Sequence, residues 1–248
     1  MTSTAGSTGP TGPPERSRRI PRFTRAERSV HRATAVLMLL CVGAAACLYV
    51  APLAQLVGRR HLVVVVHEWS GILLPVPFLL GLASSAFRAD LRRLNRLAQY
   101  DKEWLRAVRR RWTSPGLRPA GKFNAGQKIY AGWIAGAVPI MMFTGLLMWF
   151  TGLLPVISRT SAIFVHDVTA LAIGVVLLGH LRLAYRDPQA RRGMRTGFVE
   201  PAWAAREHSE WMEEDRAAGL SSPSGRGLGR REGERLMGRR GRRRARRP

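Results

Sequence analysis

Four histidines lie within hydrophobic segments of this 248-residue chain, where an ionisable side chain is unusual. His31 opens the first segment, His67 lies early in the second, and the fourth segment contains both His166 and His180. An ionisable residue at membrane depth is costly and usually has a functional partner. Neutral imidazole is a common ligand of haem iron. The pattern therefore predicts metal centres that carry electrons within a membrane.

The expected depths of these histidines pair them across helices. With both chain termini on the inner side, His31 lies near the inner surface and His67 near the outer surface. His166 then lies near the outer surface, and His180, fourteen residues later, lies about 21 Å deeper in a helix. Fourteen steps of about 100° return close to the starting direction, so both side chains share one face. We expect His31 to meet His180 and His67 to meet His166.

Each predicted pair joins two helices, as ligation of a flat macrocycle from both sides requires. Two axial histidines leave no open position for oxygen, which favours electron transfer over oxygen chemistry. Zinc is a weaker alternative, because no cysteine is expected at these depths to complete a tetrahedral set. Two other interpretations are hydrogen-bonded packing residues and a proton relay that includes Glu68 and Asp167. His61 is a spare candidate for His67, and His208 is not expected to bind a haem.

Four apolar blocks must position the histidines, and each is long enough to cross a hydrocarbon core, which takes about 20 helical residues. We predict an all-α integral membrane protein, a four-helix bundle around two stacked b-type haems. The spans lie near residues 33–57, 62–87, 129–157 and 162–183. A leader (1–21) and a basic tail (213–248) flank the membrane domain (22–212), and both are expected to be disordered because they are too polar to build a core.

The net charge of +24 is distributed unevenly along the chain. Lys and Arg occur seven times in 16–32, eleven times in 88–122 and eighteen times from 182 to the end. The two short connections between spans carry only three arginines. Basic residues stay on the cytoplasmic side, so the chain is predicted to lie in the cell membrane with both termini cytoplasmic. The surplus charge then faces anionic lipid, and no nucleic-acid partner is expected.

Two further segments are predicted to be amphipathic helices at the membrane surface, although the first could equally be a solvated connector. The two cysteines are predicted to be inert. Residues 88–112 place leucines at helical spacing among arginines, and a second such helix surrounds Trp203 and Trp211. Cys41 and Cys47 both fall in the first span and do not form a disulfide framework. We interpret them as small apolar packing residues.

A second polar site is predicted where the third span enters the membrane, in the segment 122–128 (KFNAGQK). Asn124 and Gln127 place amide groups at the inner surface, and one interpretation is helix capping, for which Asn is well suited. The other is a quinone site, because a quinone carbonyl needs a hydrogen-bond donor and Gly126 leaves room for a ring. His180, in the inner pair, would be nearest. Both interpretations are compatible.

At this point the sequence resembles a known family, the gamma subunit of membrane-bound formate dehydrogenases, which is a dihaem cytochrome b. The resemblance covers approximately residues 20–212. It is carried by 22–31 (RFTRAERSVH), 67–71 (HEWSG), 122–128 (KFNAGQK), Thr144-Gly145, Trp149, His166, His180, and a tail with Gly193-Met194, Gly197, Val199, Trp203-Ala204, His208 and Trp211. The Arg-rich extension after Gly219 lies outside it.

The resemblance implies a membrane-anchoring subunit of formate dehydrogenase. It implies haem ligation by His31 with His180 and by His67 with His166, and reduction of menaquinone or another quinone near Asn124 and His180. Electrons would come from an iron–sulfur (beta) subunit, which is fed by a molybdenum or tungsten (alpha) subunit that oxidises formate. Two alternatives remain: a cytochrome b subunit of a hydrogenase or thiosulfate reductase, and a haem-free membrane anchor or transport protein.

Overall fold

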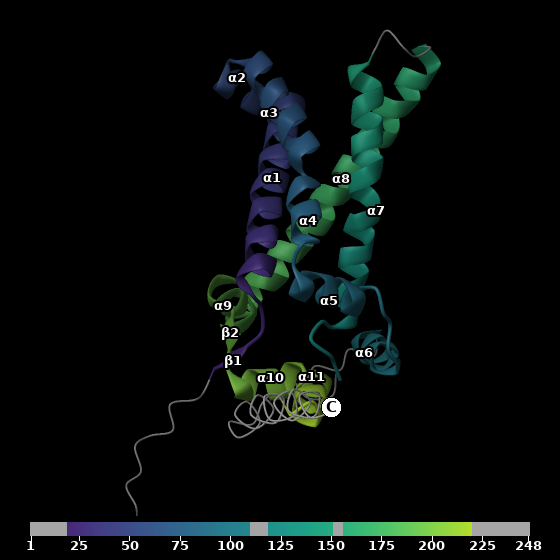
Figure 1. Ribbon diagram of the computed structural model, residues 1–248. Helices are drawn as coiled ribbons and strands as arrows, with labels where there is room; N and C mark the ends of the chain where they lie inside the picture. The colour runs from purple at the N-terminus through teal and green to yellow at the C-terminus, as the bar shows by residue number, and fades with distance from the viewer. Residues whose placement is uncertain (1–18, 110–118, 151–155, 220–248) are drawn as a thin grey trace, which may run out of the picture.

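The computed structural model describes residues 19–109, 119–150 and 156–219. Four of its helical segments are long and apolar enough to cross a membrane, namely Arg25–Tyr49, Arg60–Gly81, Ala125–Trp149 and Arg159–Arg186. The prediction of an all-α protein with four membrane-spanning segments is confirmed. In Figure 1 the spans run along the height of the molecule, the short helix Ala51–Val57 lies at the upper end, and most of the other short elements gather at the lower end.

The first two spans pack against each other, and the second is interrupted between two helices. Helix α1 (Arg25–Tyr49) starts with a reciprocal capping box between Thr24 and Glu27, and it contacts α3 (Arg60–Leu73) and α4 (Val76–Gly81). The predicted span 33–57 is split, because the chain becomes extended at Val50 and restarts as α2 (Ala51–Val57), with a proline in its first turn. The second span stops at Gly81 rather than at residue 87.

The third and fourth spans form the other pair. Helix α7 (Ala125–Trp149) and helix α8 (Val156–Arg186) contact each other in the halves that contain Thr144 and His166. Helix α8 then crosses behind the other spans and ends near the N-terminus of α1 (Figure 1). The prediction that the third span reaches residue 157 is wrong, since Val156 already begins α8. Residues 151–155 lie outside the described residues.

The predicted surface helix 88–112 is two helices in the structure. Helix α5 (Ser85–Leu94) starts at Ser84, whose hydroxyl caps Phe87 N, and α6 (Gln99–Arg109) follows after a break. Both α5 and α6 pack against α7. Residues 110–112 lie outside the described residues.

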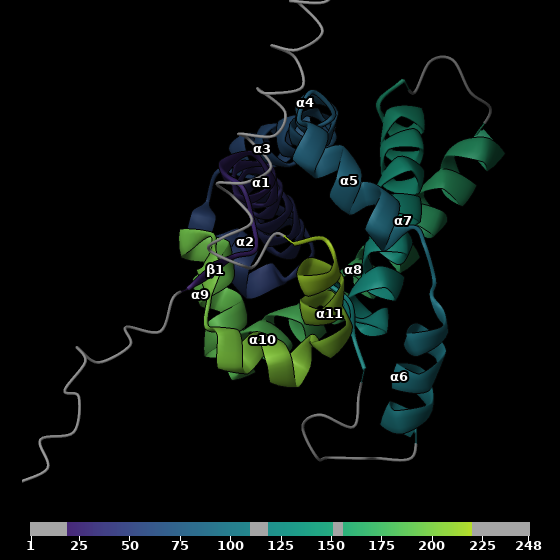
Figure 2. The ribbon, with the colours of Figure 1, turned by 60° about the horizontal axis from the view of Figure 1, so that its bottom comes forward.

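The C-terminal part of the described chain folds back under the spans (Figure 2). Helix α9 (Pro188–Thr196) leads into β2 (Phe198–Val199), which pairs antiparallel with β1 (Ile20–Pro21), and helices α10 (Pro201–Glu207) and α11 (Ser209–Ala217) follow. The predicted boundaries at 21 and 212 are therefore displaced: β1 lies inside the expected leader, and α11 continues into the expected tail. The rest of both segments lies outside the described residues.

Trp203 and Trp211 do not form an interfacial helix. Both are buried in a small core with Val199, Ala204 and Met212, and Ile20 packs against this core. A helix that packs on a lipid surface and a helix that packs on a protein core have the same amphipathic pattern. Here the two tryptophans pack in a protein core below the spans, which we call the foot of the bundle.

Candidate metal centres

The pair that we predict to lie near the outer surface, which we call the outer pair, joins α3 to α8. The ring centres of His67 and His166 lie 6.2 Å apart, and the rings are nearly perpendicular. His67 Nδ1 is 3.0 Å from the carbonyl oxygen of Cys41 on α1. Because a carbonyl oxygen only accepts hydrogen bonds, Nδ1 carries the proton and donates it. The lone pair of His67 is therefore on Nε2, the nitrogen available to a metal.

His166 is held in the same protonation form by a different group. Thr144 Oγ1 is 2.9 Å from His166 Nδ1 and 2.8 Å from the carbonyl oxygen of Ile140. A hydroxyl has one proton, and Thr144 donates it within its own helix, so its oxygen accepts from His166 Nδ1. Gly145 lies directly against the ring, since a Cβ there would be 3.5 Å from His166 Cε1.

The inner histidine pair joins α1 to α8 at the other end. The ring centres of His31 and His180 lie 6.5 Å apart. Tyr130 of α7 stacks on His180 with ring centres 4.7 Å apart and planes within 12°. Among the described residues, none is hydrogen-bonded to either inner imidazole. The structure thus brings together both pairs that the sequence predicted.

The spacing within each pair fits two imidazoles that bind one metal ion from opposite sides. A metal lies about 2 Å from a bound imidazole nitrogen, and the ring centre about 1 Å beyond it, so facing rings are about 6 Å apart, centre to centre. The observed distances of 6.2 and 6.5 Å agree. No group of three or more His, Cys, Asp or Glu side chains that could hold a metal occurs within the described ranges. The donor set thus suits a haem better than tetrahedral zinc.

An apolar layer lies between the two pairs, and each span contributes one buried residue to it. Met38 follows His31 by seven residues, and Leu74 follows His67 by seven. Ile173 is seven residues from both histidines of α8. The layer is therefore about 10 Å from either pair at the helical rise per residue. Its members are Met38, Leu74, Ala137 and Ile173.

Cys41 is not at the depth that the sequence analysis assumed. Its Sγ is 3.6 Å from His67 Nδ1, so the expectation that no cysteine lies level with the histidines is wrong. Gly71 lies beside the same sulfur, since a Cβ there would be in ordinary van der Waals contact with it at 3.8 Å. Cys41 and Cys47 are both free thiols, as predicted. The position of Cys41 could have been calculated from the sequence. It is ten residues beyond His31 on the same helix, and the helical rise carries it toward the depth of His67.

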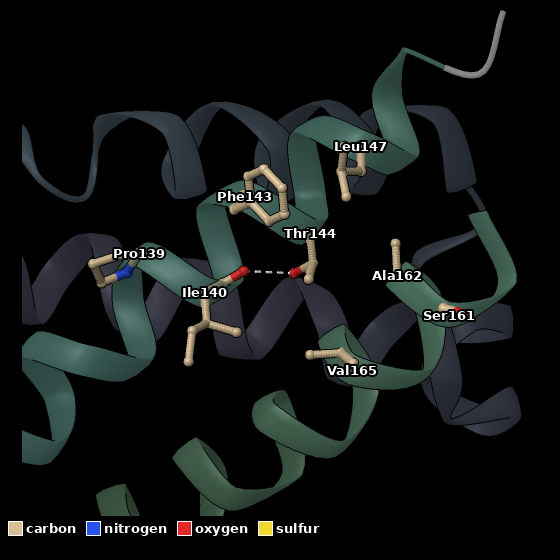
Figure 3. Close-up of a pocket in the computed structure, with 8 residues that line it drawn as sticks. All are labelled: Pro139, Ile140, Phe143, Thr144, Leu147, Ser161, Ala162 and Val165. Carbon is tan, nitrogen blue, oxygen red and sulfur yellow. Dashed lines mark hydrogen bonds between the residues drawn. The ribbon is translucent and has the colours of Figure 1, made fainter. Parts of the chain in front are cut away.

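The other polar groups of the outer half lie apart from the pair. Tyr49 Oη donates to Asp167 Oδ1 at 2.7 Å, which ties the end of α1 to α8 and gives Asp167 a structural partner. His61 is exposed at the start of α3. An apolar groove of about 650 Å³ is lined by residues of both α7 and α8 (Figure 3), and Thr144 links it to the outer pair. It is lined by Pro139, Ile140, Phe143, Thr144, Leu147, Ser161, Ala162 and Val165.

The predicted quinone residues have structural partners. Asn124 and Gln127 cap the first turn of α7 reciprocally, with bonds of 2.9 and 3.0 Å, as the capping interpretation expects. Trp104 of α6 covers Gly126, since a Cβ there would be 3.1 Å from its ring. The structure connects this segment with His180 through Tyr130, a residue that the sequence analysis did not select.

Comparison with known proteins assigns the chain to a family. The sequence model of the prokaryotic cytochrome b561 family matches residues 22–197, a range that contains both histidine pairs. The chain belongs to this family, whose members are membrane proteins that bind haem b.

Its curated relatives are subunits of one kind of enzyme. The formate dehydrogenase cytochrome b556 subunit of Haemophilus influenzae is 24% identical over 66% of this chain and 68% of its own length. The cytochrome b556(fdo) subunit of Escherichia coli strain K12 is 25% identical over 79% of this chain and 93% of its own. The nitrate-inducible cytochrome b556(Fdn) subunit of the same strain is 26% identical over 44% of this chain and 51% of its own.

Proposed function

We propose that this chain is the membrane cytochrome b subunit of a formate dehydrogenase and passes electrons through two haems b to a quinone. The observation that carries the proposal is the pairing of four imidazoles at two levels, with ring centres 6.2 and 6.5 Å apart. The similarity to formate dehydrogenase subunits supports the choice of partner enzyme.

His67 and His166 would hold the outer haem, and His31 and His180 the inner one. Each haem supplies an iron that alternates between ferric and ferrous states. The four imidazoles would be the protein's ligands to the two haems, and a haem held by two histidines would suit electron transfer rather than oxygen chemistry. In the outer pair, the carbonyl of Cys41 and the hydroxyl of Thr144 hold the rings in the form that offers Nε2.

The outer end would receive electrons from an iron–sulfur (beta) subunit, attached to a molybdenum or tungsten (alpha) subunit that oxidises formate. The charge pattern supports this orientation, since Lys and Arg concentrate at the end that holds the inner pair. Both termini would then be cytoplasmic. Electrons would move inward against the membrane potential, which is negative inside, so their flow would help to maintain this potential.

A quinone, menaquinone by family resemblance, would be reduced at the inner end near Asn124, Gly126, Gln127 and His180. The capping bonds occupy the amide oxygens of Asn124 and Gln127. The amide NH₂ groups are separate donors, and a quinone carbonyl needs such a donor. Trp104 and Tyr130 would line this site, one against Gly126 and the other against His180.

Two measurements on the purified full-length chain and its complex test the proposal. A pyridine haemochrome assay is expected to give about two b-type haems per chain. Formate added to membranes is then expected to reduce these haems, and a molybdenum subunit is expected to co-purify. A well-folded chain without haem would refute the electron-transfer role. A hydrogenase large subunit in the complex would instead show that the partner enzyme is wrong.

A further inference from the structure

Four charged side chains are buried together beneath the inner histidine pair. Arg22, Glu27, Asp90 and Lys122 are each at most 8% exposed. They come from the segment before α1, from α1 itself, from α5 and from the segment that leads into α7. Burying charge is costly unless the charges are paired. The cluster holds two cations and two carboxyl groups, so its members can pair.

Lys122 bridges the two carboxyl groups. Its Nζ is 2.5 Å from Asp90 Oδ2 and 3.3 Å from Glu27 Oε1. The second oxygen of Glu27 accepts from Thr24 N at 2.5 Å. Arg22 lies alongside, where it donates to the carbonyl oxygen of Lys122 at 2.8 Å. Asp90 is therefore connected through Lys122 to Glu27 of α1 by an unbroken series of polar contacts.

The cluster extends from the aqueous surface to a level one helical turn from His31 of the inner pair. Asp90 Oδ1 accepts from Arg93 Nη1 at 3.1 Å, and the Arg93 side chain is 51% exposed. Asp90 thus has one oxygen beside a hydrated residue and the other inside the cluster. At the opposite side, Glu27 is four residues before His31 on α1, one turn lower on the same helix face.

Asp90 is suited to exchange protons near neutral pH. Burial raises the pKa of Asp90 to about 6, and the neighbouring Glu27 carboxylate also raises it, although Lys122 lowers it. The charged groups around Asp90 are Arg22, Glu27, Arg93 and Lys122, which come from the segment before α1, from α1, from α5 and from the segment before α7.

We propose that Asp90, with Lys122 and Glu27, relays protons from the cytoplasmic surface to the quinone that is reduced at the inner end. This inference rests on the proposed function. The quinone gains two electrons and two protons and becomes a quinol. For each proton that leaves the cluster toward the quinone, Asp90 takes another from water beside Arg93, so the cluster returns to its starting charge.

The chain contains a matched control. Lys128 and Asp101 form a second buried ion pair, with Nζ and Oδ2 2.5 Å apart, and it ties α6 to α7 as Lys122 and Asp90 tie α5 to the segment before α7. No second carboxyl group contacts Lys128 among the described residues, and the pair makes no described contact with α1. Asp101→Asn therefore removes a buried carboxylate from the same kind of structural tie without removing the relay.

The test follows the reoxidation of prereduced haem by menadione, a soluble quinone, in the purified full-length protein across a range of pH. In the wild type we expect the rate to fall as pH rises through about 6, because Asp90 then loses its proton. Asp90→Asn is expected to be about tenfold slower or more, with no such pH dependence. Asp90→Glu should restore the dependence, and Asp101→Asn should retain it.

A second readout does not depend on turnover. Infrared spectra of the wild type should show a buried carboxyl group that titrates near neutral pH, and Asp90→Asn should remove this signal while Asp101→Asn keeps it. If Asp90→Asn does not assemble, the titration in Asp101→Asn and wild type decides, and its absence overturns the relay.

The outcomes separate the two proposals. A wild-type protein whose haems are reduced but are not reoxidised by the quinone would refute the quinone-reducing function. Rapid wild-type reoxidation with an unchanged rate and pH profile in Asp90→Asn would refute the relay alone. Equal loss of the pH profile in Asp90→Asn and Asp101→Asn would show that the cluster has only a structural role.

Discussion

The two histidine pairs of this molecule resemble each other in spacing and differ in how the protein holds the rings. In the outer pair, each Nδ1 donates to an oxygen, one on α1 and the other on α7. In the inner pair, His180 stacks on Tyr130, and neither ring is hydrogen-bonded to a described residue. A hydrogen bond from Nδ1 to oxygen orients an imidazole and makes its other nitrogen a stronger donor to a metal.

This difference bears on the direction of electron flow. A stronger nitrogen donor stabilises ferric over ferrous iron and so lowers the reduction potential. We therefore expect the outer haem to have the lower potential and the inner haem the higher one. Electrons that enter at the outer end would then move toward the higher reduction potential at the inner end, which lowers their free energy and agrees with the proposed function.

The largest expected effect comes from removing a ligand. His67→Ala and His180→Ala should each lower the haem content from about two to about one per chain, because a haem with one axial histidine loses half of its attachment. Pyridine haemochrome analysis measures the content, and His61→Ala is the matched control. Retention of both haems in either variant would contradict the ligand assignment.

Removing one hydrogen bond of the outer pair should have a smaller effect on one haem only. Thr144→Val keeps the shape of the side chain but removes the acceptor for His166 Nδ1. Loss of such a partner typically weakens a metal site by 10–100-fold, so we expect a lower haem affinity of that order. The midpoint potential of that haem should rise by about 60 mV for each tenfold loss of preference for the ferric state.

A potentiometric titration resolves the two haems and measures this shift. Thr144→Ser keeps the hydroxyl and should leave both potentials close to the wild type. If Thr144→Val changed the midpoint potential of the inner haem and left that of the outer haem constant, Thr144 would not act on the outer pair as we infer.

Loss of the stacking partner in the inner pair should be milder still. Tyr130→Leu removes an aromatic contact that is worth about 0.5–1.5 kcal/mol, so only the inner haem should change its potential or occupancy. Tyr130→Phe retains the ring and serves as the control. Equal changes at both haems in the same titration would mean that Tyr130 acts on the packing of the whole bundle.

His208 sharpens the comparison because both of its ring nitrogens are engaged. Nδ1 donates to the carbonyl oxygen of Gly121 at 2.7 Å, and Nε2 accepts from Arg22 at 3.0 Å. Burial, followed by the charge of Arg22, lowers the pKa of His208 to about 3. His208→Gln should therefore leave haem content unchanged, which the same haemochrome assay checks.

The sign of the pH effect at His208 follows from its lowered pKa. The unfolded imidazole takes up a proton below about 6.5 while the folded one stays neutral down to about 3, so unfolding gains protons as pH falls. The foot of the bundle should lose stability below about pH 6.5, by at most about 1.4 kcal/mol per pH unit. Tryptophan fluorescence during thermal unfolding, to which Trp203 and Trp211 contribute, measures it, and a slope unchanged in His208→Gln would assign the effect to other groups.

Several features of the fold and the site could be predicted from the sequence for physical reasons. Length and hydropathy identify a span, because the hydrocarbon core sets the number of helical residues. Depth along a span is set by the helical rise, so the meeting of His31 with His180 and of His67 with His166 was predictable. The breaks at Val50 and Pro75 were missed because a helix can be interrupted without any change in hydropathy.

The groups that hold the rings were harder to predict. Whether Cys41 or Thr144 faces a histidine depends on how one helix is rotated against another, and periodicity within a single helix does not give that rotation. Trp203 and Trp211 were misplaced because an apolar helix face is the same pattern against lipid and against protein. Lys122 and Asp90 are far apart in the sequence, and only the folded chain shows that they meet.

The layer formed by Met38, Leu74, Ala137 and Ile173 has a consequence for energy conversion. Electrons can tunnel between the levels of the two histidine pairs through this packed layer of side chains, but hydronium and hydroxide need water or a chain of polar groups to cross it. A membrane protein that moves charge in one direction must insulate its two faces against the return of protons. In this chain the layer is a single slice of side chains, so under the proposed function a polar substitution such as Ile173→Asn would let protons leak through while the four histidines stay in place.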